Sequence, residues 1–135
     1  TAIRAKFEKT EIFSVEPQYF DDTKKSLEKN EIISNSMNHK SICDALLAEK
    51  PGNITFGINK LNLTSGVSVT DNEALKAMNA AYKHFKIVLE PGGAVALAAA
   101  ISGKIDIKNK NVLVIASGGN VDKNVFESCL NTETI

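Results

Sequence analysis

A serine and an asparagine flank two glycines late in the chain, directly after an apolar run. Ser117-Gly118-Gly119-Asn120 follows Asn111 to Ala116 (NVLVIA), a run typical of a buried parallel strand. Ligands of open α/β sheets sit beyond the carboxyl ends of the strands, and glycines let the backbone approach them closely. A hydroxyl at Ser117 is therefore placed to bind a ligand. A tight turn that caps a helix starting near Val121 explains the same residues equally well.

A second polar position comes just before an apolar helix. Glu90 precedes Pro91-Gly92-Gly93, and the following segment, Ala94 to Ile101 (AVALAAAI), is apolar on nearly every side. Such a helix is expected to be covered all round. Glu90 either faces a ligand or favours the positive N-terminus of this helix. The residues alone favour the structural interpretation.

Two carboxylates stand six residues apart across a proline-led turn. Glu16 and Asp22, with the backbone carbonyl of Phe20 between them, offer the oxygen ligands that Mg²⁺ or Ca²⁺ prefers. The rival interpretation has Asp21 and Asp22 capping a helix while Glu16 is exposed. From the residues alone, this rival is favoured.

The elements that must position these groups alternate between strands and helices. The opening residues look like a helix already running, with no N-cap before it, so we expect the chain to be cut from a longer one. Strand and helix patterns then alternate, which predicts an α/β fold with a mostly parallel sheet flanked by helices. The expected strands are Glu11 to Val15, Gly66 to Thr70 and Asn111 to Ala116, and the expected helices are Asp21 to Asn30, Ile42 to Ala48, Asp71 to Phe85 and Ala94 to Ile101.

Composition excludes several classes of protein. Among 135 residues, sixteen basic side chains balance sixteen acidic ones, which argues against a nucleic-acid or anionic-membrane binder. No apolar run approaches the ~20 residues of a membrane span. Cys43 and Cys129 are isolated and form no zinc pattern with His39 and His84. Nothing indicates an oxidising compartment, so a cytoplasmic location is expected.

The segments, in this order, resemble those of the serine/threonine dehydratase and serine racemase family of fold-type II pyridoxal-phosphate (PLP) enzymes. VLVIASGGNVD (112–122) resembles the family's LSGGNVD, and IVLEPGGAVALAAAISGKI (87–105) resembles EPAGAxALAAL. FSVEPQYFDD (13–22) is similar to VEPxxADD, and the segment from Ser41 to Phe56 is similar to the T-I-A-D-G region. The likeness covers residues 1 to about 130, and its motifs are specific in combination.

The resemblance implies a cofactor site. The Ser117 hydroxyl would hydrogen-bond the pyridine nitrogen of PLP, and Glu90 would lie near the ring. Ala45 stands where the family has a glycine against the ring, so it adds a methyl group at that face. Glu16, the carbonyl of Phe20, and Asp22 match the spacing of a cation site in part of the family, which implies Mg²⁺, Mn²⁺ or Ca²⁺ in a structural or activating role. EPGG in place of EPAG is a mild departure.

The resemblance also implies what this chain does and what it lacks. Residues 1–135 correspond to the C-terminal portion of the catalytic domain, a partial large domain of the tryptophan-synthase-β-like fold. The Schiff-base lysine, the substrate-carboxylate loop and the glycine-rich phosphate loop are not found in this sequence. The whole enzyme would take a hydroxy amino acid such as threonine or serine, eliminate the β-hydroxyl and release a 2-oxo acid and ammonia.

Other functions remain open at this point. Serine racemisation, dehydration of another hydroxy amino acid, and a non-catalytic ligand-binding α/β domain are the alternatives. The isolated chain is expected neither to bind PLP measurably nor to catalyse a reaction, since a single neutral hydrogen bond contributes only ~1 kcal/mol. We expect it to form homo-oligomers through the uncovered apolar surface of the helix from Ala94 to Ile101.

Overall fold

The computed structural model describes residues 1–133 and confirms the α/β fold with a parallel sheet and flanking helices. Strands β1 (Phe13–Pro17) and β2 (Ser65–Val69) pair in parallel, with Val15 opposite Val67. Both strands lie within two residues of their predicted positions. The helices are α1 (Ala2–Lys6), α2 (Asp22–Lys29), the 3₁₀ turn η1 (Asp44–Leu46), α3 (Asn53–Asn62), α4 (Asp71–Ala80), the π-helical turn η2 (Ala81–Phe85), α5 (Pro91–Ile101) and α6 (Lys123–Leu130).

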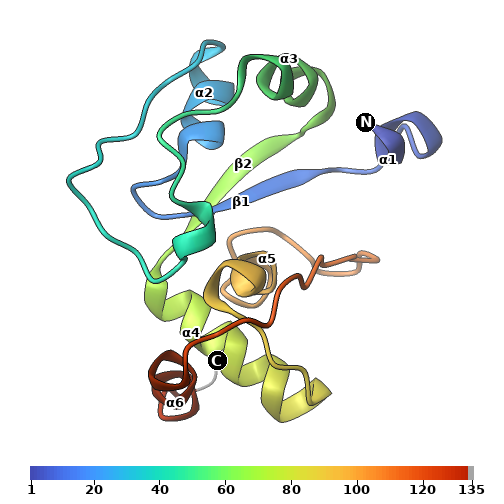
Figure 1. Cartoon of the computed structure of the whole chain (residues 1–135). Coiled ribbons are helices and arrows are strands. Elements are labelled where there is room, and N and C mark those ends of the chain that lie inside the picture. The colour runs from blue at the N-terminus through green and yellow to red at the C-terminus, as the bar shows by residue number, and fades with distance from the viewer. Residues whose placement is uncertain (134–135) are drawn as a thin grey trace.

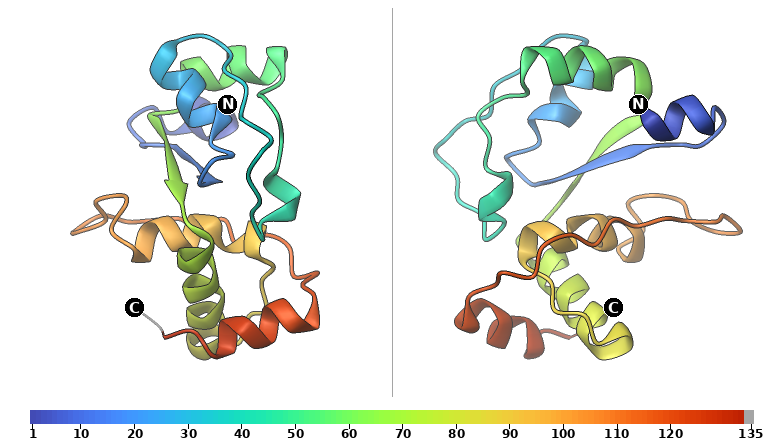
Figure 2. Two further views of the ribbon diagram at one scale, coloured as in Figure 1. Left: turned by 90° about the vertical axis from the view of Figure 1, so that its left-hand side faces the viewer. Right: turned by 45° about the vertical axis from the view of Figure 1, so that its right-hand side comes forward.

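The sheet separates two layers of helices. Figures 1 and 2 show α2 and α3 over one face of β1 and β2, and α5 across the other face with α4 and α6 beyond it. The core lies mainly on the α5 side, where Val69, Met78, Leu89 and Ala98 are buried together. The first turn of α5 and the extended chain after residue 110 thus lie on the same side of the sheet.

The apolar run from Asn111 to Ala116 is not a strand in this structure, which corrects the sequence prediction. The segment is extended but has no strand partner, and Leu113 is 81% exposed and Ile115 is 63% exposed. A strand exists only where a neighbour supplies hydrogen bonds. The apolar composition of residues 111–116 suits the interior of a sheet. Within residues 1–133, however, β1 and β2 pair only with each other.

Helix α5 is well covered, contrary to the expectation that it leaves a large apolar surface exposed. Gly93, Ala94, Val95 and the run Ala98 to Ala100 are buried, because α4 and the two strands pack against the helix. Exposed apolar side chains lie instead on the extended segment just described and on α3, where Ile54 and Leu61 are each 81% exposed. No helix among the described residues is long and apolar enough to cross a bilayer.

Two other helices differ from their predictions. The segment from Ile42 to Ala48 forms only the short turn η1, and α3 was not predicted. Apolar residues do recur at helical spacing in α3 (Ile54, Ile58 and Leu61), but they are exposed, and Phe56 is the buried residue of this helix. Helix α4 begins at Asp71 as expected, and its N-cap Thr70 forms a capping box with Glu73.

Candidate functional site

The first turn of α5 brings together the three residues predicted to contact a cofactor. Gly93 packs against the turn after the extended segment, since a Cβ there would lie 2.7 Å from the carbonyl carbon of Ser117. A Cβ at Gly92 would lie 3.6 Å from the Cβ of Ala45. Glu90, the N-cap of α5, donates its N–H to the carbonyl of Gly118 at 3.1 Å. We call Ser117, Glu90 and Ala45 the candidate cofactor site.

Glycines make these approaches possible. Gly118 has a φ of 71°, and a Cβ there would lie 2.6 Å from the carboxyl carbon of Glu90. This left-handed conformation is strained for most other residues. The Glu90 side chain therefore lies directly against the backbone after Ser117, and any side chain at position 118 would displace it.

Ser117 is held by its backbone and leaves its side chain free. Its carbonyl faces Gly93, while within residues 1–133 its hydroxyl makes no hydrogen bond to protein. The residue is exposed, as is Ala45, and Glu90 is half-buried. The turn thus offers a hydroxyl at Ser117 without a protein partner among the described residues, and the Glu90 carboxylate lies against the next residue, Gly118, so polar groups are present that could orient a ligand.

Two departures from the family motif lie in contact with each other. Ala45 replaces the family's glycine, and Gly92 replaces the alanine of EPAG. The 3.6 Å separation of the Ala45 Cβ from a Cβ built at Gly92 is ordinary van der Waals contact. A methyl group at position 92 would therefore fit beside that of Ala45, so neither departure requires the other. The sequence showed the two changes separately and gave no sign that they are neighbours.

A mainly apolar groove lies elsewhere in the molecule. A groove of about 420 Å³ runs between β1 and the extended segment, and none of the three candidate cofactor residues lines it. Its walls are mainly apolar and include Phe13, Val15, Ala100, Val112 and Ile115. Position and polarity both separate this groove from the candidate cofactor site.

Glu16 caps helix α2, although it was expected either to bind a cation or to be exposed. Its carboxylate oxygens accept the N–H groups of Thr23 and Lys24, each at 2.9 Å. These are orphan donors of the first helical turn, where a negative charge is favourable. Asp21 precedes the helix, but its side chain makes no capping hydrogen bond. The exposed glutamate and capping aspartates of the rival interpretation are therefore wrong.

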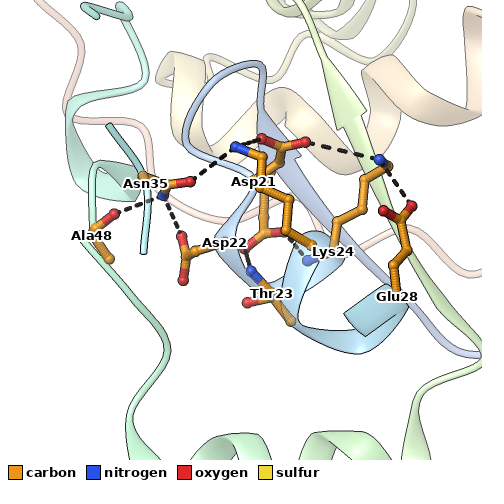
Figure 3. Close-up of polar contacts among 9 residues, drawn as sticks. Asp21, Asp22, Thr23, Lys24, Glu28, Asn35 and Ala48 are labelled. Atoms are coloured by element: carbon orange, nitrogen blue, oxygen red, sulfur yellow. Dashed lines mark hydrogen bonds and ion pairs between the residues drawn. The ribbon is translucent and has the colours of Figure 1, made fainter. Parts of the chain in front are cut away.

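The two aspartates take part in a buried polar network (Figure 3). Asp21 forms ion pairs with Lys25 at 2.7 Å and with Lys24 at 3.9 Å. Asp22 accepts a hydrogen bond of 2.8 Å from Asn35, whose amide also donates to the carbonyl of Ala48. Asn35 was not predicted, because a polar residue in an irregular stretch gives no local sign of burial.

Glu16 and Asp22 are two desolvated carboxylates that influence each other. Burial raises the pKa of both groups, and the charge of Asp22 adds to the effect at Glu16. Within the described residues, no three His, Cys, Asp or Glu side chains gather into a metal-binding group. The predicted cation site, which uses two carboxylates and the Phe20 carbonyl, is a different arrangement and stays a prediction.

The chain is similar to a family of enzymes and to several known proteins. The profile of a family described as "Pyridoxal-phosphate dependent enzyme" matches residues 1–118. Serine racemase of Schizosaccharomyces pombe is 36% identical over 112 residues, covering 83% of this chain and 34% of the relative. L-threonine ammonia-lyase of Thermotoga maritima is 34% identical over 91 residues, covering 67% of this chain and 22% of the relative.

A solved structure shows the same fold. The serine racemase of Dictyostelium discoideum superposes with a TM-score of 0.78 at 36% identity, over 88% of this chain and 38% of that one. The chain thus spans about a third of the length of the relatives it matches.

Proposed function

The chain belongs to the pyridoxal-phosphate dependent enzyme family, and from that premise we propose that it forms the C-terminal part of the catalytic domain of a threonine or serine ammonia-lyase. The observation that carries the proposal is the convergence of Ser117, Glu90 and Ala45 on the first turn of α5. Since the chain spans only part of its relatives, the activity is proposed for the whole protein.

The residues present fit one side of a PLP ring. Bound PLP supplies an electron sink for charge that develops at the substrate α-carbon. The hydroxyl of Ser117 would hydrogen-bond the pyridine nitrogen, and Ala45 would place a methyl group at a ring face where the family has glycine. A neutral hydroxyl does not hold that nitrogen protonated as a carboxylate would. The sink is then weaker, which suits elimination of a β-hydroxyl.

A chimera tests the proposed reaction. This chain would replace the matching part of the Dictyostelium discoideum serine racemase. The rest of that protein is expected, from the family resemblance, to supply the Schiff-base lysine and the phosphate loop. We expect PLP absorbance and release of a 2-oxo acid from threonine or serine. A chimera that is folded by circular dichroism but retains no PLP would contradict the proposal.

Product analysis separates the two candidate reactions. The racemases among the relatives support racemisation as the second candidate. D-Serine as the main product from L-serine would favour it over the lyase. The isolated chain itself is predicted to give no PLP absorbance change in a titration, because it offers only the nitrogen side of the ring.

We propose in addition that Glu16, the Phe20 carbonyl and Asp22 bind Mg²⁺, Mn²⁺ or Ca²⁺. Two buried carboxylates with raised pKa values support this, since a cation would offset their desolvation. A saturating cation at pH 7 is expected to raise the melting temperature, by mass action worth about 2.7 kcal/mol at 100 times Kd. Differential scanning fluorimetry measures this.

Variants and pH check the cation prediction. Glu16→Gln should abolish the thermal shift, whereas Glu31→Gln, at an exposed carboxylate, should keep it. Without cation, a raised folded-state pKa means that stability is gained as pH falls toward the ordinary Glu value of 4.5. An unchanged melting temperature with all three cations would rule the site out.

Self-association and a cytoplasmic location complete the proposal. The exposed apolar side chains of Val112, Leu113 and Ile115 support pairing of chains, in place of the α5 surface first expected. Sedimentation showing a monomer at high concentration would count against pairing.

Cys43 and Cys129 are free thiols, which supports a reducing compartment. The partner we propose for the whole protein is an amino-acid substrate, with no role for nucleic acid or membrane.

A further inference from the structure

The segment from Ser41 to Leu46 carries Ala45 and has almost no regular structure of its own. It contains only the single turn η1, and it lies beside the first turn of α5. Yet Cys43 in its middle is completely buried and belongs to the main core. Something other than secondary structure must hold this segment in place.

Asp71, the first residue of α4, holds it with both carboxylate oxygens. The Ser41 hydroxyl donates to Oδ1 at 2.5 Å, and the N–H of Ile42 donates to Oδ2 at 3.1 Å. The Ser41 oxygen in turn accepts the N–H of Cys43 at 3.1 Å. Ser41 and Ile42 are thus bonded directly to the Asp71 side chain and Cys43 is bonded through Ser41, and bonds to a charged acceptor are the stronger kind.

The anchor is itself rigid. The N-terminus of α4 is fixed by the capping box of Thr70 and Glu73, and Glu73 also forms an ion pair with Lys104 at 3.2 Å. The capping box uses neither oxygen of Asp71, so both are available to the segment. A carboxylate in the first helical turn is further stabilised by the helix dipole.

We propose that Asp71 is a positioning residue, whose carboxylate fixes the Ser41–Leu46 segment so that Ala45 stays against Gly92 at the first turn of α5. That this contact matters for a cofactor rests on the proposed function, but the anchoring of the Ser41–Leu46 segment by Asp71 does not. The tests of this anchoring therefore need no PLP, so a negative result in them can be told apart from a negative result for the proposed function.

Thiol labelling reports opening of the segment. Burial raises the pKa of Cys43 to about 11, so its thiol is protonated and hidden while the segment is closed. Asp71→Ala is expected to speed labelling of Cys43 about tenfold or more, as measured by mass spectrometry. Cys129, buried in α6, reports global unfolding and should react at its original rate.

Two further variants separate the tether from a general loss of charge or stability. Asp71→Asn keeps one acceptor oxygen for Ser41 and should restore most of the protection lost in Asp71→Ala. Asp106→Asn makes the same chemical change at an exposed residue and should leave both labelling rates unchanged. Equal acceleration at both cysteines in Asp71→Ala would show unfolding and overturn the proposal.

A nuclear Overhauser contact between the Ala45 methyl and the Gly92 α-protons reports positioning directly. This contact is expected in the native chain and in Asp106→Asn, and it should be lost in Asp71→Ala. Unchanged Cys43 labelling in Asp71→Ala would overturn the proposal. Faster labelling with the Ala45–Gly92 contact intact would overturn it equally, because the tether would then not place Ala45.

Discussion

Replacing Gly93 with alanine is expected to destabilise the protein by about 3 kcal/mol. The new Cβ would lie 2.7 Å from the carbonyl carbon of Ser117 and 2.9 Å from the carbonyl oxygen of Gly118. Both atoms belong to the backbone, so relief requires the whole turn to move away from α5. Urea unfolding followed by circular dichroism measures the loss, a large part of the ~5–15 kcal/mol that stabilises a typical domain.

Gly92→Ala is the matched control, one residue away in the same helical turn. Its Cβ would meet Leu46 and Ala45 at 3.5 and 3.6 Å, which is ordinary contact. Alanine also favours helix, so we expect stabilisation by about 0.5 kcal/mol. Equal effects of the two substitutions would show that Ser117 does not approach α5 as described.

Replacing Gly66 with alanine should cost a similar amount, about 3 kcal/mol, at the other side of the sheet. A Cβ on this β2 residue would lie 2.5 Å from the Cα and 2.6 Å from the Cβ of Lys24 in α2. The helix would have to lift from the strand, and Lys24 is one of the two residues whose N–H groups Glu16 caps. Chemical denaturation again measures the effect.

Gly57→Ala serves as the control for this substitution. Gly57 lies in α3 and is exposed, and a Cβ there would meet no atom within 4 Å. The change should stabilise the helix by about 0.5–1 kcal/mol. A Gly66→Ala variant as stable as Gly57→Ala would mean that α2 does not pack on β2 this closely.

Short sequence patterns correctly predicted the helices and strands that are determined by residues close together in the chain. The start of α4 at Asp71, the strands near Val15 and Val67, and the apolar helix after Glu90 all follow from spacing and composition. The run from Asn111 to Ala116 was wrongly assigned as a strand because a strand depends on a partner that composition does not reveal. Helix α3 was missed although Ile54, Ile58 and Leu61 recur at helical spacing, and this apolar stripe is exposed in the structure.

The candidate cofactor site was harder to predict from short stretches of the sequence. Ser117 and Glu90 were singled out from the residues, but their roles and Ala45 came from resemblance. The capping role of Glu16 was not predicted, because its side chain serves a helix that begins six residues later. Contacts such as Ala45 with Gly92 join residues far apart in sequence, and only folding brings them together.

In the proposed function, the Ser117 hydroxyl hydrogen-bonds the pyridine nitrogen of PLP. The most direct test is the ¹⁵N chemical shift of ring-labelled PLP bound to the chimera, compared with its Ser117→Ala variant. We expect the shift of an unprotonated, hydrogen-bonded pyridine, which moves toward that of a pyridine without a hydrogen bond in Ser117→Ala. A pyridinium shift, or an identical shift in the two proteins, would contradict the claim.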